Sequence, residues 1–267
     1  MSLGMRANGA QTDECVILIK AQPHRSSGYF ETVCCAGVGR DGKWRRQYPV
    51  PFRILQEDQK FGRWTWIEYK FVTPKDDRRS ESQKVISHSL RTTGDLKSKE
   101  RASFLSPLVI SSLREADEAR SSLALVRPQS IRLSAYPKSD SELLDEAVKH
   151  KTLADQLSLL EGDAPAEPLK PCRMQFVVDW KDQDGRTHRQ ECDDWETSAA
   201  FNRFDRQYGE KRALEIITEK YEEQYFKAGL VLGFSTHSRR NVEYGTRNQW
   251  LLVGLIRLDR TTQGTLF

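Results

Sequence analysis

The chain has 267 residues, of which 30% are charged and 37% belong to the hydrophobic set. Lys and Arg number 42 against 38 Asp and Glu, so the formal net charge is +4. The chain is more polar than average, but its 6 Trp, 8 Tyr and 11 Phe exclude a fully disordered protein. The longest apolar run, residues 250–256, is far shorter than the roughly 18–20 residues that cross a bilayer, so no membrane partner is expected.

The cysteines indicate a reducing environment. They are odd in number, and no two of them form a C-x-x-C pair, which argues against a disulfide framework and a zinc site. We therefore expect a cytoplasmic protein with no resident metal and no cofactor. Residues 1–13 lack the apolar core of a secretory signal and are expected to form a disordered leader.

Charge is distributed unevenly along the chain. Residues 1–107 carry 19 Lys and Arg against 12 Asp and Glu, a net charge of +7, whereas residues 108–267 have a net charge of −3. Such asymmetry is compatible with a polyanion bound by the first half, and equally with a solvated surface that happens to be basic.

The first half is predicted to be rich in strands. β-branched or alternating apolar stretches with turn residues between them predict strands at residues 15–21, 31–38, 44–48 and 64–72, with an Asp-Gly hairpin turn at Asp41 and Gly42. Several short strands of this kind favour a small barrel or sandwich. Residues 74–101 are expected to be a charged loop, residues 98–119 a helix, and residues 121–126 and 131–136 two further strands.

The second half mixes helices and strands. Ser139 or Ser141 is expected to cap a helix through residue 159, with Leu143, Leu144 and Val148 on its apolar side, before a Pro-rich linker at 162–171. Strands are predicted at 173–180, 186–192, 230–234 and 250–258, and a long helix at 197–227 that Gly209 can split.

The predicted fold is therefore α+β, with two small β-barrel-like (OB-like) units, a helical insertion and a long C-terminal helix. The expected boundaries are 1–13 for the leader, 14–137 for the N-terminal unit with its insertion, 138–171 for the helix and linker, and 172–267 for the C-terminal unit.

Two stretches carry a resemblance to a known family. Residues 31–37 (ETVCCAG) followed by 42–46 (GKWRR) resemble the "C-x-A-G, then G-x-W-x-R" opening of dual OB-containing proteins, and residues 193–195 and 250–256 occupy the places of their second barrel. Residues 48–53 and 77–81 are also similar to uncharacterised bacterial proteins. The resemblance implies nucleic-acid-associated work in bacterial conflict or defence.

A basic and aromatic face is the leading candidate site. Proteins that bind single strands need cations along the phosphates and flat rings for the bases, at roughly 1–3 kcal/mol per stacked base. The side chains that meet this description are Lys43, Arg45, Arg46, Tyr48, Arg53, Trp64, Trp66, Arg78, Arg79, Arg239 and Arg240. The alternative for both Trp is the core of a small barrel, and for the loops at 76–82 and 235–240 an ordinary charged surface.

Two other functions stay open. Asp193, Asp194 and Glu196 are the one acidic cluster that resembles a metal-dependent nuclease or nucleotide hydrolase, which would use Mg²⁺. The same acids are also typical of a helix N-terminus, where they cap free N–H groups. In the other alternative, the chain is a structural subunit that binds a protein partner through the C-terminal helix. We expect a nucleic-acid-binding accessory protein of a bacterial defence or genome-maintenance system, and not an enzyme.

Overall fold

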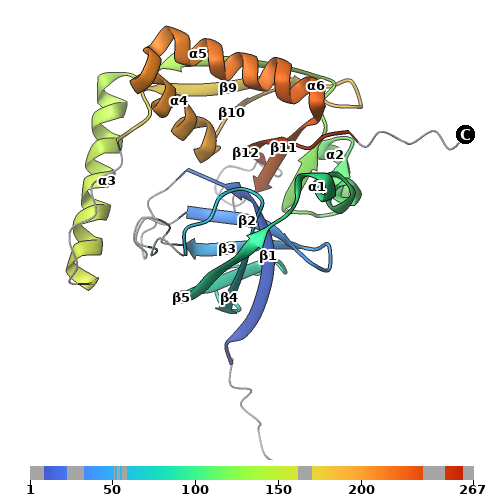
Figure 1. The fold of residues 1–267 in the computed structure, drawn as a ribbon, viewed down its shortest axis with the longest axis vertical. Coiled ribbons are helices and arrows are strands. Elements are labelled where there is room, and N and C mark those ends of the chain that lie inside the picture. The colour runs from blue at the N-terminus through green and yellow to red at the C-terminus, as the bar shows by residue number, and fades with distance from the viewer. Residues whose placement is uncertain are drawn as a thin grey trace, which may run out of the picture.

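The computed structural model describes residues 9–22, 33–50, 52, 55, 59–161, 170–236 and 250–260. It confirms an α+β protein with a closed five-stranded barrel and further sheets (Figure 1). The first strand begins at Gln11, so residues 11–13 belong to the barrel and not to a leader. Their pairing with strand β4 (Thr65–Val72) supplies backbone hydrogen bonds that the local composition does not reveal.

The barrel contains β1 (Gln11–Lys20), β2 (Val33–Gly39), β3 (Trp44–Val50), β4 (Thr65–Val72) and β5 (Ser82–Asp95). Their order around the barrel is β1-β2-β3-β5-β4, and β1 closes it by pairing with β4. All pairs are antiparallel except β3 with β5. The predicted turn at Asp41 and Gly42 connects β2 to β3, and Gly42 has the positive φ of 73° that such a turn favours.

The prediction of a charged loop at 74–101 is wrong for residues Ser82–Asp95, which form strand β5. This segment has few large apolar residues, because several of its buried positions hold polar side chains such as Ser82 and Gln83. It forms a strand because its backbone pairs on both sides, with β4 and with β3. Tertiary pairing here outweighs local apolar content.

The strands that follow the barrel form a second unit, which has two sheets in its described part. The prediction of a second barrel is wrong there. One sheet has the order β10-β9-β8 and the other β12-β11-β7-β6. Their strands are β6 (Val109–Ile110), β7 (Leu123–Val126), β8 (Ser130–Pro137), β9 (Met174–Lys181), β10 (Thr187–Glu191), β11 (Leu230–Thr236) and β12 (Trp250–Arg257). Because β7 pairs with β11 and β8 with β9, both belong to this unit, and the boundary lies well before residue 137.

One predicted helix is broken into shorter elements. The expected helix at 98–119 is divided into α1 (Ser98–Leu105), a 3₁₀ turn (Ser106–Leu108), β6 and α2 (Leu113–Glu118). Pro107 lies in the turn, and the backbone of β6 pairs instead with β7.

The long C-terminal helix is confirmed, and it is split at Gly209 as the sequence suggests. It consists of α4 (Trp195–Tyr208), α5 (Glu210–Thr218), a π-helical stretch (Glu219–Tyr225) and α6 (Phe226–Gly229). Gly209 has φ +79° and ψ 162°, which ends α4 and starts α5 in a new direction.

Helix α3 (Asp140–Glu161) stands apart from the rest of the molecule (Figure 1). Ser139 caps it as predicted: its Oγ accepts from the Glu142 N–H at 3.3 Å, and the Glu142 carboxylate accepts from the Ser139 N–H at 2.8 Å. The apolar side of this helix is not packed against the core at Leu144 and Val148. These two side chains are 65% and 56% exposed.

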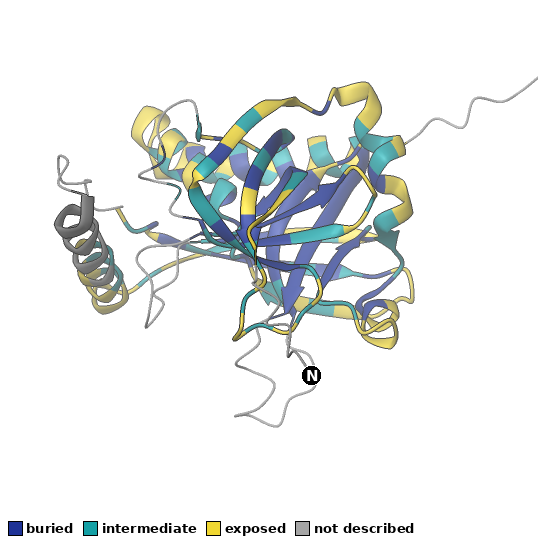
Figure 2. Ribbon diagram, turned by 90° about the horizontal axis from the view of Figure 1, so that it is seen from below, coloured by how far each residue is buried: buried dark blue, intermediate teal, exposed yellow. Residues whose placement is uncertain are grey.

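Three apolar clusters hold the fold together. The first fills the barrel, and the third lies between the two sheets of the second unit and helices α4–α6. The second cluster joins the units: Val16, Val38 and Trp66 on the outside of the barrel pack with Leu125, Val231 and Val253 of the second unit. Buried residues accordingly continue from one unit into the other (Figure 2). No helix of the described chain is long and apolar enough to span a membrane.

Candidate functional site

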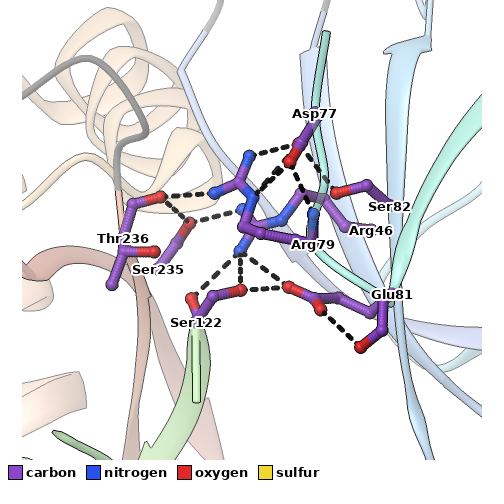
Figure 3. A network of polar contacts seen from close by, with 9 residues as sticks. Arg46, Asp77, Arg79, Glu81, Ser82, Ser122, Ser235 and Thr236 are labelled. Carbon is purple, nitrogen blue, oxygen red and sulfur yellow. Dashed lines mark hydrogen bonds and ion pairs between the residues drawn. The ribbon is translucent and has the colours of Figure 1, made fainter. Parts of the chain in front are cut away.

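Arg46 lies where the barrel meets the second unit (Figure 3). Only 3% of it is exposed. Its Nη1 donates to Ser235 Oγ at 2.6 Å, and its Nη2 donates to Ser122 O at 3.0 Å and Oγ at 2.8 Å. The Glu81 carboxylate lies 3.6 Å from Nη2. Arg46 therefore connects the two units, and the expectation that it contacts phosphate is wrong for this conformation.

Arg79 is held in the same network by Asp77 (Figure 3). Its Nε donates to Asp77 Oδ1 at 2.9 Å, and its Nη1 donates to the Thr236 carbonyl oxygen at 2.8 Å. Ser82 Oγ donates to Asp77 Oδ2 at 2.7 Å. Burial alone would raise the pKa of Asp77, but the hydrogen bonds from Arg79 and Ser82 lower it to about 2. These contacts fix the β4–β5 loop, residues 73–81, against the second unit.

Lys75 and Arg78 in the β4–β5 loop are exposed, and so is Lys43 before β3. The Arg46 N–H donates to Glu81 O at 2.8 Å, so the end of the loop lies beside the first half of β3. Arg45 is less available, because its guanidinium pairs with Asp13 at 2.6 Å and with Asp41 at 3.1 Å. Among the predicted phosphate contacts that the structure describes, Lys43 and Arg78 are open to solvent.

The two tryptophans are core residues. Trp64 is 9% and Trp66 6% exposed, and both belong to the cluster between the units. The guanidinium carbons of Arg101 and Arg40 lie 4.4 Å and 4.1 Å from their respective ring centroids. The expected stacking role is wrong for both indoles, because they are buried in the cluster that contains residues of α1 and of the second unit. Tyr48 is half-buried in β3.

The acidic cluster is a helix cap. Asp194 is fully buried and is the N-cap of α4: its Oδ1 accepts from the Glu196 N–H at 3.3 Å, and its Oδ2 accepts from Thr197 Oγ1 at 3.0 Å and the Leu255 N–H at 3.3 Å. The nuclease alternative needs carboxylate oxygens open to metal ions, and those of Asp194 are occupied. The described chain contains no group of three or more His, Cys, Asp or Glu that could hold a metal ion.

Arg63 has a buried ion-pair role that the sequence does not predict. Its Nη2 lies 3.3 Å from Asp194 Oδ1, and its Nε lies 3.5 Å from Glu196 Oε2. Lys20 Nζ, 3.4 Å from Glu196 Oε1, completes the cluster. Burial alone would raise the pKa of Glu196, but the charges of Arg63 and Lys20 hold it below its ordinary value. Nothing in the local sequence of Arg63 predicts this, because its partners lie more than a hundred residues away.

Other predicted residues fall elsewhere. Arg53, Arg239 and Arg240 lie outside the described residues. The apolar face of the C-terminal helix is buried against the sheets, through residues that include Phe201, Ala213, Ile217 and Tyr221. This helix therefore supports the core of its own unit.

Fold and site together define a two-unit α+β protein. A closed barrel packs against a second unit of sheets and helices, and hydrogen bonds from Arg46 connect the two. Residues 106–267 match the family described as "Domain of unknown function (DUF8757)", and residues 11–107 match "Domain of unknown function (DUF8758)". The first of these matches spans more than half of the chain, so the protein belongs to the DUF8757 family. No curated protein and no solved structure matches the chain.

Proposed function

We propose that the protein is a nucleic-acid-binding accessory protein built on an OB-like barrel. A five-stranded Greek-key barrel of this kind binds oligonucleotides through its strands and through the β1–β2 and β4–β5 loops. The barrel order β1-β2-β3-β5-β4, with β3 and β5 parallel, supports this assignment. The barrel also lies in the positively charged part of the chain, because residues 1–107 have a net charge of +7.

The observation that carries the proposal is the fixed β4–β5 loop. Asp77, Arg79 and Thr236 hold this loop in place, while Lys75 and Arg78 in the same loop stay exposed. Because the backbone of this loop is already held in place, binding to a phosphate backbone has to order only the Lys75 and Arg78 side chains. We therefore place the phosphate contacts at Lys75 and Arg78, with the exposed Lys43 as a further contact.

Fluorescence anisotropy with labelled single- and double-stranded DNA and RNA tests this site. Binding by the wild type is expected to weaken as salt rises, with a slope of about −0.7 per phosphate contact for single strands. The double variant Lys75→Ala/Arg78→Ala is expected to bind about ten-fold more weakly and to lower that slope by about 1.4, since it loses two contacts.

The matched control is Lys97→Ala/Lys99→Ala. It removes the same charge from exposed positions at the start of α1. Equal weakening of binding in both double variants would reject the loop as the binding site. Binding that does not depend on salt concentration, or no binding at all, would reject the nucleic-acid-binding function. Mg²⁺-dependent cutting of the DNA or RNA that is lost in Asp194→Asn would support the nuclease alternative.

We place this activity in the cytoplasm, within a bacterial defence or genome-maintenance system. All five cysteines are unpaired thiols, and Cys15, Cys35 and Cys192 are fully or almost fully buried. Unpaired thiols in this number suit a reducing compartment. The role in defence or genome maintenance rests on the resemblance to dual OB-containing proteins.

A second candidate function is that of a partner-binding subunit, and helix α3 favours it. Leu144 and Val148 lie one turn apart and are both exposed on a helix that stands away from the body (Figure 1). The partner tested is a second copy of the chain. The double variant Leu144→Ser/Val148→Ser is expected to abolish self-association in sedimentation-velocity runs across a concentration series. A wild type that stays monomeric at every concentration would exclude a second copy of the chain as the partner.

A further inference from the structure

A pocket of about 570 Å³ opens on the second unit, away from the β4–β5 loop. It lies between the turn after α1, strand β6 and the ends of β7 and β12, with the β9–β10 turn at its rim. Its lining residues are Ser106, Val109, Ile110, Ser111, Arg127, Gln183 and Arg260. The volume falls within the range of about 300–1,000 Å³ that is common for small-ligand sites.

The charge of this pocket is positive and uncompensated. Two arginines line it, and none of its described lining residues is acidic. Within the described chain neither guanidinium has a carboxylate within ion-pair distance, whereas those of Arg45, Arg63 and Arg79 all do. Burial and the positive charge of Arg260 lower the pKa of Arg127. Two like charges that share a pocket favour an anion between them.

The framework around Arg127 is ordered by hydrogen bonds. Its Nη1 donates to Leu258 O at 3.3 Å, and its carbonyl oxygen accepts from Gln183 Nε2 at 2.9 Å. Gln183 is itself fixed, because its N–H donates to Ser111 O at 3.1 Å and its carbonyl oxygen accepts from Gln129 Nε2 at 3.2 Å. Strands β6, β7 and the β9–β10 turn are thus tied together beneath the arginine.

We infer that this pocket binds the phosphate groups of a small phosphorylated molecule. Arginine presents its N–H groups as a planar fork that matches phosphate oxygens in pairs, so Arg127 and Arg260 supply the contacts. Val109 and Ile110 of β6 line the pocket beside the two arginines, where the rest of the ligand would lie. This site shares no residue with the proposed nucleic-acid site and does not depend on it.

Calorimetric titration of the full chain with sodium pyrophosphate tests the inference. Saturable binding is expected for the wild type, with affinity at least ten-fold lower in Arg260→Met. Arg260 is exposed, so its replacement leaves the fold intact. Arg127→Lys, which keeps the charge and loses the fork, is expected to weaken binding as well. The control Arg114→Met removes an exposed arginine that pairs with Asp184 near the rim and is expected to bind like the wild type.

Unchanged affinity in Arg260→Met, equal loss in Arg114→Met, or no saturable binding by the wild type would each overturn the inference. The variant Lys75→Ala/Arg78→Ala separates the two sites: it is expected to keep pyrophosphate binding and lose oligonucleotide binding. A 5′-phosphorylated oligonucleotide that competes with pyrophosphate, while its unphosphorylated form does not, would identify a strand end as the source of the phosphate.

Discussion

Arg63 has surroundings unlike those of a surface arginine, and its side chain is only 9% exposed. Its Nη1 donates to Leu255 O at 2.7 Å, and its Nε donates to Leu18 O at 2.9 Å. The same guanidinium neutralises Asp194 and Glu196, so it connects the barrel to β12 and to the start of α4. Four partners from three distant parts of the chain depend on this one side chain.

The variant Arg63→Met is expected to lower the free energy of unfolding by about 3–5 kcal/mol, because it leaves the buried Asp194 carboxylate without its counter-charge. Urea denaturation measures this change. The control Arg91→Met removes an arginine that is 67% exposed and pairs with Glu68, and it is expected to cost at most about 1 kcal/mol. Similar costs for the two variants would show that the Arg63 cluster does not stabilise the fold.

At the scale of elements, the break between α4 and α5 is set by one residue. With φ +79° and ψ 162°, Gly209 occupies a region that other residues rarely adopt. The chain turns there so that α4 and α5 each direct an apolar face at the same core, through Phe201 on the first and Ala213 and Ile217 on the second. A continuous helix would follow one straight axis past that core.

Gly209→Ala is therefore expected to destabilise the protein by about 1–3 kcal/mol through backbone strain alone. A methyl group at this position meets nothing within 4 Å, so steric contact does not contribute. Gly62→Ala is the matched control, because that position is equally open and its φ lies outside the left-handed region. Thermal unfolding followed by circular dichroism should show a lower midpoint for the first variant only.

At the scale of the whole molecule, the two units share one apolar cluster and one polar network. Val16, Val38 and Trp66 of the barrel are buried in one cluster with Leu125, Val231 and Val253 of the second unit. Arg46 and Arg79 add hydrogen bonds to Ser122, Ser235 and Thr236 at the edge of that cluster. Separation of the units would expose both the apolar surface and the buried Arg46 guanidinium.

Calorimetry of the full chain is expected to show a single unfolding transition, with equal calorimetric and van't Hoff enthalpies. The physical reason is that neither unit can unfold without exposing the shared cluster of the other. Arg46→Met is expected to shift this one transition to lower temperature without dividing it. Two resolved transitions in the wild type would show that the units are independently stable.

The sequence by itself determined the elements whose signals are local. Alternating apolar residues predicted most strands, Asp41 and Gly42 the first hairpin, Ser139 the cap of α3, and Gly209 the division of the C-terminal helix. These features depend on backbone preferences and side chains within a few residues of each other, so one sequence is enough to recognise them.

Only the tertiary structure decided which charged and aromatic residues stay available. Arg46 and Arg78 look alike in sequence, but a sheet from the other unit covers the first and leaves the second exposed. Trp64 and Trp66 lie in the apolar cluster between the units, where Arg101 and Phe104 of α1 contact them, and Arg63 pairs with Asp194 across 131 positions of sequence. Burial and ion pairing are set by segments that meet only in the folded chain, and they decide which side chains a ligand can reach.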